Sequence, residues 1–144
     1  VRKNADRQIR VAENVLDCSF DLAMPSITVG MHYIGGDLSV NRYKWGRFTK
    51  PVVKEWMRDL ALVIRVVVSA QGSVFTPPIT VTVGGCFRDK RSSPDLHNLH
   101  KVIGDALEDG LGINDKEFRF VDGESSYGCK EPYIIIETKS RSKE

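Results

Sequence analysis

The residue types best suited to chemistry are concentrated between Asp95 and Asp115. Asp95 stands where a helical pattern begins. His97, Lys101 and Asp105 are spaced four residues apart, which places their side chains along one face of a helix. Carboxylate and imidazole groups bind divalent cations, and an ammonium group can meet the charge of a phosphate. The segment therefore predicts a site for metal-assisted chemistry on a phosphate.

A second acidic position follows this helix after a short connection. Residues 110–113 contain two glycines, which allow the chain to turn back and bring Asn114 and Asp115 towards the helix. We expect Asp95, His97 and Asp115 to converge on one or two divalent cations. Mg²⁺ needs only a few carboxylates besides waters and phosphate oxygens, and such a cation polarises a phosphoryl group and activates an attacking water.

Each of these residues also has a purely structural interpretation. Asp95 can serve only as a helix cap, and Asp115 only as a turn residue. His97 can be an exposed helix residue, and Lys101 can pair with Asp105 across one helical turn. The combination favours chemistry, because an ordinary exposed helix face carries mostly Glu and Lys.

The helix that carries these residues has an apolar face on its other side. We expect it to begin near residues 93–95 and to end at Gly110, a natural helix-terminating residue. The expected core positions are Leu96, Leu99, Val102, Ile103, Ala106 and Leu107. Burial of this face leaves the polar face free for solvent or a ligand.

The remaining elements predict an α/β fold of the α+β type. A longer amphipathic helix is expected to begin at Thr49, which can cap it, and Pro51, and to stop at Gly72. Residues 4–16 are compatible with a further helix. Strands are expected at residues 26–34, 79–83, 118–121 and 133–138, with the glycines after residue 83 ending or bulging the second. This order predicts a two-layer sandwich, in which the two main helices pack on one side of a mixed sheet.

Length and composition indicate one domain. The 144 residues, 41% hydrophobic and 28% charged, suffice for one core. We assign residues 1–25 to an N-terminal extension and residues 26–144 to the domain itself. The longest apolar run, residues 60–70, is interrupted by Arg65 and is shorter than the roughly 20 residues that a membrane span needs. With no visible signal peptide, the sequence predicts a cytoplasmic protein.

The cysteines predict no cross-link. Cys18, Cys86 and Cys129 are odd in number and far apart, with no CxxC pair. This pattern argues against a disulfide framework and against a structural zinc site. We expect three reduced, partly buried thiols.

The net charge of +2 is too small to identify a nucleic-acid partner, but the charges are unevenly placed. Acidic residues concentrate between Asp105 and Asp122. The basic groups are Arg2, Lys3, Arg7 and Arg10; Arg42, Lys44, Arg47 and Lys50; Arg88, Lys90 and Arg91; and Lys139, Arg141 and Lys143. A basic surface around an acidic pocket would attract phosphates to metal ligands, although ordinary solvated charges explain the same composition.

Two blocks of the sequence resemble the signature of the RusA family of Holliday junction resolvases. The block from Pro94 to Lys101, PDLHNLHK, is followed by DAL at 105–107 and by Asn114-Asp115. It is similar to the family pattern D-x-D-N-L-x-K-x-x-x-D-A-L with a later acidic pair. The block LSVNRY at 38–43 is similar to the family's P-P-S-x-N segment. The resemblance covers about residues 27–138.

The resemblance implies an endodeoxyribonuclease of DNA recombination and repair, from a bacterium or a phage. Such an enzyme uses Mg²⁺ or Mn²⁺ and nicks two strands of a four-way DNA junction symmetrically as a homodimer. Asp95 and Asp115 match the family's metal-binding aspartates, and Lys101 matches its catalytic lysine. Asp105 and Asn98 match positions that support the helix and the site, and Asn114 is expected to support the site as well. The expected DNA-binding residues are Asn41, Arg42, Lys44, Arg88, Lys90 and Arg91.

Two positions depart from the family pattern. His97 stands where the family has its second aspartate, and Asn114 stands where it has the first member of its acidic pair. Imidazole suits Mn²⁺ and transition ions better than Mg²⁺, so we expect a metal site that is either shifted towards Mn²⁺ or weakened. Two alternatives to an active resolvase therefore stay open. One is a branched-DNA-binding protein that has lost efficient cleavage, and the other is a nuclease for other branched nucleic acids, such as flaps, forks or structured RNA.

Overall fold

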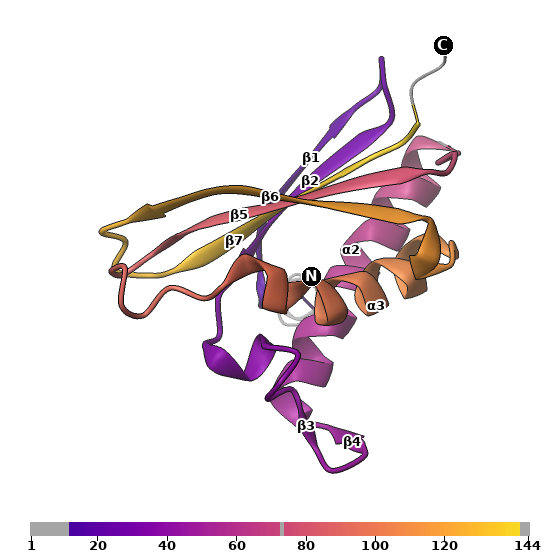
Figure 1. Ribbon diagram of the computed structural model, residues 1–144. Helices are drawn as coiled ribbons and strands as arrows, with labels where there is room; N and C mark the ends of the chain where they lie inside the picture. Colours follow the sequence, from indigo (N-terminus) through magenta and orange to yellow (C-terminus); the bar gives the residue numbers. More distant parts are fainter. Residues whose placement is uncertain (1–11, 73, 142–144) are drawn as a thin grey trace, which may run out of the picture.

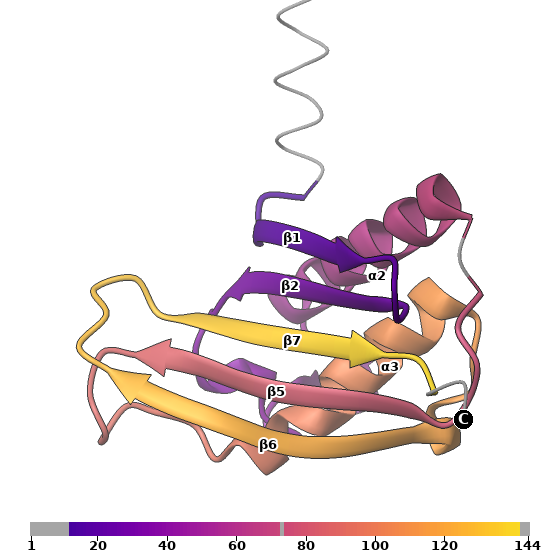
Figure 2. The ribbon, with the colours of Figure 1, turned by 90° about the horizontal axis from the view of Figure 1, so that it is seen from above.

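The computed structural model describes residues 12–72 and 74–141, which form a five-stranded mixed sheet with two helices on one of its faces (Figures 1 and 2). The strands of the sheet are β1 (Val15–Asp21), β2 (Ser26–His32), β5 (Ile79–Phe87), β6 (Phe118–Tyr127) and β7 (Tyr133–Lys139). A separate hairpin consists of β3 (Lys44–Trp45) and β4 (Phe48–Thr49). The helices are α2 (Pro51–Gln71) and α3 (His100–Leu111), and the short 3-10 turns are η1 (Gly36–Leu38), η2 (Leu96–Leu99) and η3 (Asp115–Glu117). The predicted two-layer α+β sandwich is confirmed.

The last strand, β7, lies in the middle of the sheet. The strand order is β1-β2-β7-β5-β6, and β5 and β6 are parallel whereas all other neighbours are antiparallel. A bulge between Val83 and Gly85 shifts the register between β5 and β6, but β5 continues through it. Strand β1 comes from the segment that we assigned to the N-terminal extension, and it adds an edge strand to the sheet.

The two layers meet in one apolar core. Trp56 and Leu60 of α2 are fully buried against the inward-facing residues of β2, β5 and β7, such as Val29, Val81 and Ile136. All six positions predicted to face the core from residues 96–107 are buried. The polar face of the second helix therefore turns away from the sheet.

Two predictions about helices differ from the structure: the helix expected over residues 4–16 and the N-cap of α2. Val15 and Leu16 belong to β1, because their segment pairs with β2, and residues 4–11 of the expected helix lie outside the described residues. The N-cap of α2 is Lys50, because Thr49 is paired in the hairpin, and no side chain caps this helix.

Gly110 does not end its helix. The C-cap of α3 is Gly112, which has a φ of 70° and donates its backbone N–H to the carbonyl oxygen of Glu108 (2.9 Å). Gly110 instead faces α2, where a Cβ atom would lie 2.9 Å from the carbonyl oxygen of Ala61 and from the Cβ of Ile64. The missing side chain lets the two helices approach closely.

Two cysteines form a disulfide, so the expectation of three reduced thiols was wrong. Cys86 lies near the end of β5, and Cys129 lies in the turn before β7. The backbone N–H of Cys129 donates to the carbonyl oxygen of Phe87 (3.2 Å), which brings the two residues side by side. The residues are 43 positions apart, and their proximity depends on strand pairing that the spacing does not reveal. Cys18 is free and exposed.

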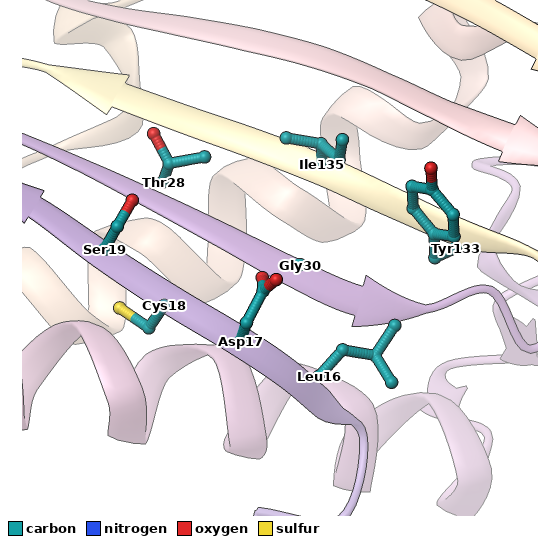
Figure 3. A pocket seen from close by; sticks show the side chains of 8 residues that line it. All are labelled: Leu16, Asp17, Cys18, Ser19, Thr28, Gly30, Tyr133 and Ile135. Carbon is teal, nitrogen blue, oxygen red and sulfur yellow. The ribbon is translucent and has the colours of Figure 1, made fainter.

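The sheet face opposite the helices carries a shallow pocket of about 530 Å³ (Figure 3). Its lining comes from β1, β2 and β7 and includes Asp17, whose carboxylate extends over Gly30. None of the described residues that line this pocket is basic, and the pocket lies on the other side of the sheet from the predicted site. Within residues 12–72 and 74–141, no helix has the length and apolar character to cross a membrane.

Replacing Gly110 by Ala tests the close approach of the helices. Helix propensity alone would stabilise this variant by up to about 1 kcal/mol. We expect the free energy of unfolding to fall by about 1–3 kcal/mol instead, because the added methyl group collides with the α2 backbone. Urea unfolding followed by circular dichroism measures the change. Gly104→Ala is the control, since its methyl group would meet only the ring of Phe120 at 3.3 Å. A Gly110→Ala variant more stable than the wild type would contradict the packing.

Candidate functional site

Asp95 begins the helical segment that carries the predicted site. Its Oδ1 accepts a hydrogen bond from the backbone N–H of His97 (3.1 Å), so the cap expected from the sequence is present, although the first turn, η2, is a 3-10 helix. The side chains of Asp95 and His97 are both exposed. Capping occupies one carboxylate oxygen and leaves the other available to a ligand.

A histidine that the sequence analysis did not select lies next to His97, and it contacts an aspartate that was not selected either. The rings of His97 and His100 meet edge to face, with 5.0 Å between their centroids. The His100 ring stacks on Phe120 at 4.4 Å, and its Nε2 lies 2.8 Å from Oδ1 of Asp122. Because Phe120 and Asp122 both belong to β6, this strand orients His100, which in turn limits the positions open to the His97 ring.

Lys101 forms an ion pair within its own helix. Its Nζ lies 3.2 Å from Oδ1 of Asp105, one turn further on. This hydrogen bond and the charge of Asp105 raise the pKa of Lys101; partial burial opposes the rise, and Tyr43 and Asp115 add to it. Lys101 therefore stays an ammonium cation at neutral and mildly alkaline pH.

The turn that carries Asp115 is fastened to α3. The backbone N–H of Asp115 donates to Oε1 of Glu108 (2.8 Å), and the side chain of Asn114 caps η3 by accepting from the backbone N–H of Lys116 (3.0 Å). These two bonds hold the Asp115 carboxylate close enough to Lys101 to influence its pKa. Asn114 thus has a structural role in this turn.

The contacts join the predicted residues in pairs. Lys101 is paired with Asp105, and Asp95 caps the N–H of His97 at the preceding turn, whereas Asp115 affects the Lys101 pKa through its charge and contacts neither pair. In the described part of the chain, no group of three or more His, Cys, Asp or Glu side chains could hold a metal ion. Convergence of Asp95, His97 and Asp115 therefore stays a prediction. Two carboxylates nevertheless fit a cation that keeps several waters and binds phosphate oxygens.

The first predicted DNA-binding segment lies against the start of this helical region. The backbone N–H of Val40 donates to the carbonyl oxygen of Asn98 (2.8 Å), which anchors the segment to η2. Asn41, Arg42 and Lys44 are all exposed beside this anchor. The segment that resembles the family's amino-terminal block is thus joined directly to the second block.

The second basic segment is the turn between β5 and η2. Its predicted DNA-binding residues, all exposed, are Arg88, Lys90 and Arg91. Asp89 shapes the turn by accepting from the backbone N–H of Ser92 (2.8 Å), and this hydrogen bond lowers the pKa of Asp89. The turn leads straight into Asp95. Of the other basic residues noted in the sequence, Arg2, Lys3, Arg7, Arg10 and Lys143 lie outside the described residues.

Sequence reasoning missed His100, Asp122 and Tyr43. His100 is three residues from His97, so the pair shares one side of a helix, which was the available signal. Tyr43 ends the first block, and its buried side chain lies near enough to Lys101 to raise the pKa of this lysine. Nothing local in the sequence links Asp122 or Tyr43 to the helix.

Carboxylates and a lysine between exposed basic turns are the side chains that a nuclease needs. The family model described as Endodeoxyribonuclease RusA matches residues 39–139, most of the chain. The chain therefore belongs to the RusA family of endodeoxyribonucleases, whose members resolve Holliday junctions.

The fold also has a distant likeness among solved structures. The OmpA-like domain of FopA1 from Francisella tularensis subsp. tularensis SCHU S4 is similar with 7% sequence identity and a TM-score of 0.47, over 89% of this chain and 82% of that one. A likeness at this level carries no functional argument. No curated protein matches the chain by sequence.

Replacing Asp105 by Asn tests the cause of the raised Lys101 pKa. We expect this pKa to fall, because its two largest favourable causes both come from Asp105. NMR titration of ¹³C-labelled lysine side chains measures it, and Asp109→Asn, which removes the partner of Arg65, is the control. The pKa of Lys101 is higher in the folded protein than in the unfolded chain. The Lys101–Asp105 pair therefore stabilises the fold at pH values below the pKa of the unfolded chain, and this contribution is lost as the pH rises through the pKa of the folded protein. An unchanged Lys101 titration in Asp105→Asn would refute the assignment.

Proposed function

We propose that this protein is a divalent-metal-dependent endonuclease that resolves four-way DNA junctions in recombination and repair. It nicks two strands symmetrically as a homodimer, in the cytoplasm of a bacterium or a phage-infected cell. The observation that carries the proposal is the family match over residues 39–139, within which Asp95, Lys101 and Asp115 occur in the order of the family motif. A twofold dimer suits a substrate with approximate twofold symmetry.

Lys101 is the residue that meets charge on the scissile phosphate. An ammonium group has three N–H donors, and Asp105 accepts from one of them. The others can donate to phosphoryl oxygens, where negative charge grows in the transition state. Its raised pKa keeps this group charged while it does so.

Asp95 and Asp115 are the carboxylates that would hold the cation, with His97 as a third ligand. When bound, Mg²⁺ or Mn²⁺ supplies polarisation of the phosphoryl group and lowers the pKa of water. The cap that Asp95 makes to the His97 N–H and the bond from the Asp115 N–H to Glu108 limit how far each carboxylate can move. The backbone carbonyl of Asn98 and the side chain of Asn114 hold the surrounding turns.

The exposed basic turns would bind the junction arms. Residues 41–44 follow Val40, which is bonded to Asn98 of η2, and residues 88–91 precede η2 in the chain, so a DNA backbone attracted by either turn would be drawn towards the start of the helix. Such phosphate contacts release counterions, and their contribution to affinity falls with rising salt concentration.

Removing each predicted catalytic residue tests this function. We expect Asp95→Asn, Asp115→Asn and Lys101→Ala each to reduce the rate of nicking of a synthetic four-way junction by at least about 100-fold. The two Asn variants should bind the junction as well as the wild type or better, because each removes negative charge near phosphates. Single-turnover nicking and gel-shift assays measure the two quantities.

The matched control is Asp21→Asn, an exposed carboxylate at the end of β1, which should cut like the wild type. Linear duplex of the same sequence tests the preference for branched DNA. If Asp95→Asn and Asp115→Asn both nick at the wild-type rate, the proposed site is wrong.

His97 predicts the metal preference. We expect wild-type nicking to be faster in Mn²⁺ than in Mg²⁺, because imidazole binds Mg²⁺ less well than it binds Mn²⁺. His97→Asp should raise Mg²⁺-supported nicking and, in calorimetric titrations, Mg²⁺ affinity as well. Equal or faster wild-type nicking in Mg²⁺ across a concentration series would contradict this role.

A second candidate function is recognition of branched DNA without efficient cleavage. The substitutions at His97 and Asn114 favour it, because each removes a carboxylate from the family's acidic set. Junction binding without nicking in any divalent cation would support it. Nicking of flaps or forks in preference to four-way junctions would support a different branched substrate.

A further inference from the structure

The β3–β4 hairpin carries two large aromatic side chains that the fold does not bury. Trp45 is 65% exposed and Phe48 is 66% exposed. Their residues face each other across the hairpin, so both side chains lie on the same face of the ribbon. The hairpin projects from the body of the protein beside the amino end of α2 (Figure 1). These rings are therefore available to a ligand.

A groove of about 510 Å³ opens beneath this hairpin, between α2 and α3. Its lining includes Arg47 and Phe48 of the hairpin region, Lys54 and Arg58 of α2, and Asp105 of α3. The Arg47 guanidinium lies 5.1 Å from the centroid of the Phe48 ring, so a cation and an aromatic face are offered together. The size of the groove suits a small organic ligand or one unit of a polymer.

The groove has an excess of available positive charge. Among the described residues, Arg47, Lys54 and Arg58 form no ion pair. The acidic side chains of the α3 wall are already neutralised. Asp105 is paired with Lys101, and Asp109 is paired with Arg65. The groove therefore attracts an anion.

Unpaired nucleotides combine the two features that this groove would recognise. Phosphates meet the cations, and a base can stack on an exposed aromatic ring, which every base allows. In a duplex the base faces are covered by their neighbours, whereas a nucleotide left unpaired at a branch point exposes them. The groove also ends at Asp105, the partner of the predicted catalytic Lys101, so a strand in it would adjoin the scissile phosphate.

We propose that the groove between the β3–β4 hairpin and helices α2 and α3 binds an unpaired stretch of a DNA strand. Phe48, which lines the groove, and Trp45, its exposed cross-strand neighbour beside the groove, stack on its bases, and Arg47, Lys54 and Arg58 bind its phosphates. The inference deepens the proposed function, because the strand that the groove holds is the one next to the cleavage site. It does not require that cleavage occur.

Tryptophan fluorescence gives a direct readout. Trp45 is exposed at the hairpin, whereas Trp56 is fully buried, so a ligand that stacks on the hairpin quenches Trp45 selectively. A single-stranded oligothymidylate of twelve nucleotides is titrated into the protein in the presence of EDTA, which prevents metal-dependent nicking. We expect saturable quenching of the wild type and no quenching of Trp45→Phe. Because this variant lacks the reporter, its binding to the oligonucleotide is measured by the anisotropy of a labelled oligonucleotide.

Two further variants test the groove itself. Phe48→Ala should weaken binding by about 5-fold to 100-fold, which corresponds to the stacking of one base. The double variant Lys54→Ala/Arg58→Ala should make the negative slope of log K against log salt concentration shallower by about 1.4. Each phosphate contact on a single strand contributes about 0.7 to its magnitude. The controls are Tyr127→Ala, an exposed aromatic of β6, and Lys130→Ala, an exposed lysine outside the groove. Circular dichroism checks that each variant folds.

The outcomes separate this inference from the proposed function. If Phe48→Ala and Lys54→Ala/Arg58→Ala bind the oligonucleotide like the wild type, or if the wild type does not bind it at low salt, the groove is not a DNA site even when junctions are nicked. If the groove variants lose binding and no junction is nicked in any cation, the groove stands and the nuclease proposal fails.

Discussion

Helix α3 lies against Ala61 and Ile64 of α2 at Gly110, which contributes no side chain of its own to this contact, and the orientation of the candidate site follows from it. Once the apolar side of residues 96–107 is buried, the side with His97, Lys101 and Asp105 has to face outward. Rotation of the helix would bury charged groups without partners, which is costly. The same contact fixes where α3 ends, and hence where the turn carrying Asp115 can start. A packing constraint thus determines the placement of polar chemistry.

The charged side chains around the site divide into paired and unpaired sets. Within the described residues, the carboxylates paired with a lysine or an arginine are Asp37, Asp105 and Asp109, and Asp122 lies within hydrogen-bond distance of His100. Asp95 and Asp115 are not among them, and neither are the basic side chains of the groove. A paired group has its charge compensated within the protein, whereas the charge of an unpaired group is available to a ligand. Unpaired carboxylates suit a cation, and unpaired cations suit phosphates, so the two sets are complementary to a metal and to a nucleic acid respectively.

Features that depend on local sequence could be predicted, and those that depend on strand pairing could not. Helical periodicity identified the buried positions of α3, and side-chain chemistry identified the Asp95 cap, because both act within one or two turns. The Cys86–Cys129 bond and the contact of His100 with Asp122 join segments whose proximity arises only from the sheet. The helix end was misplaced at Gly110 for a related reason. Two glycines, at 110 and 112, are equally able to end a helix, and contact with α2 decides between them. The convergence of Asp95, His97 and Asp115 is a prediction that geometry leaves to experiment.

The central position of β7 has a consequence for how the chain is made. Strands β1 and β2 on one side and β5 and β6 on the other have no direct pairing, and β7 joins them. A ribosome delivers β7 last among these strands, so the sheet stays in two separate parts until residues 133–139 have emerged. During that interval the edges of β2 and β5 that later pair with β7 have no partner, and unpaired strand edges of this kind are prone to associate with other chains. The sheet is therefore completed late in synthesis and in a single step. Chains that terminate before residue 133 would aggregate and would not form a smaller version of the domain.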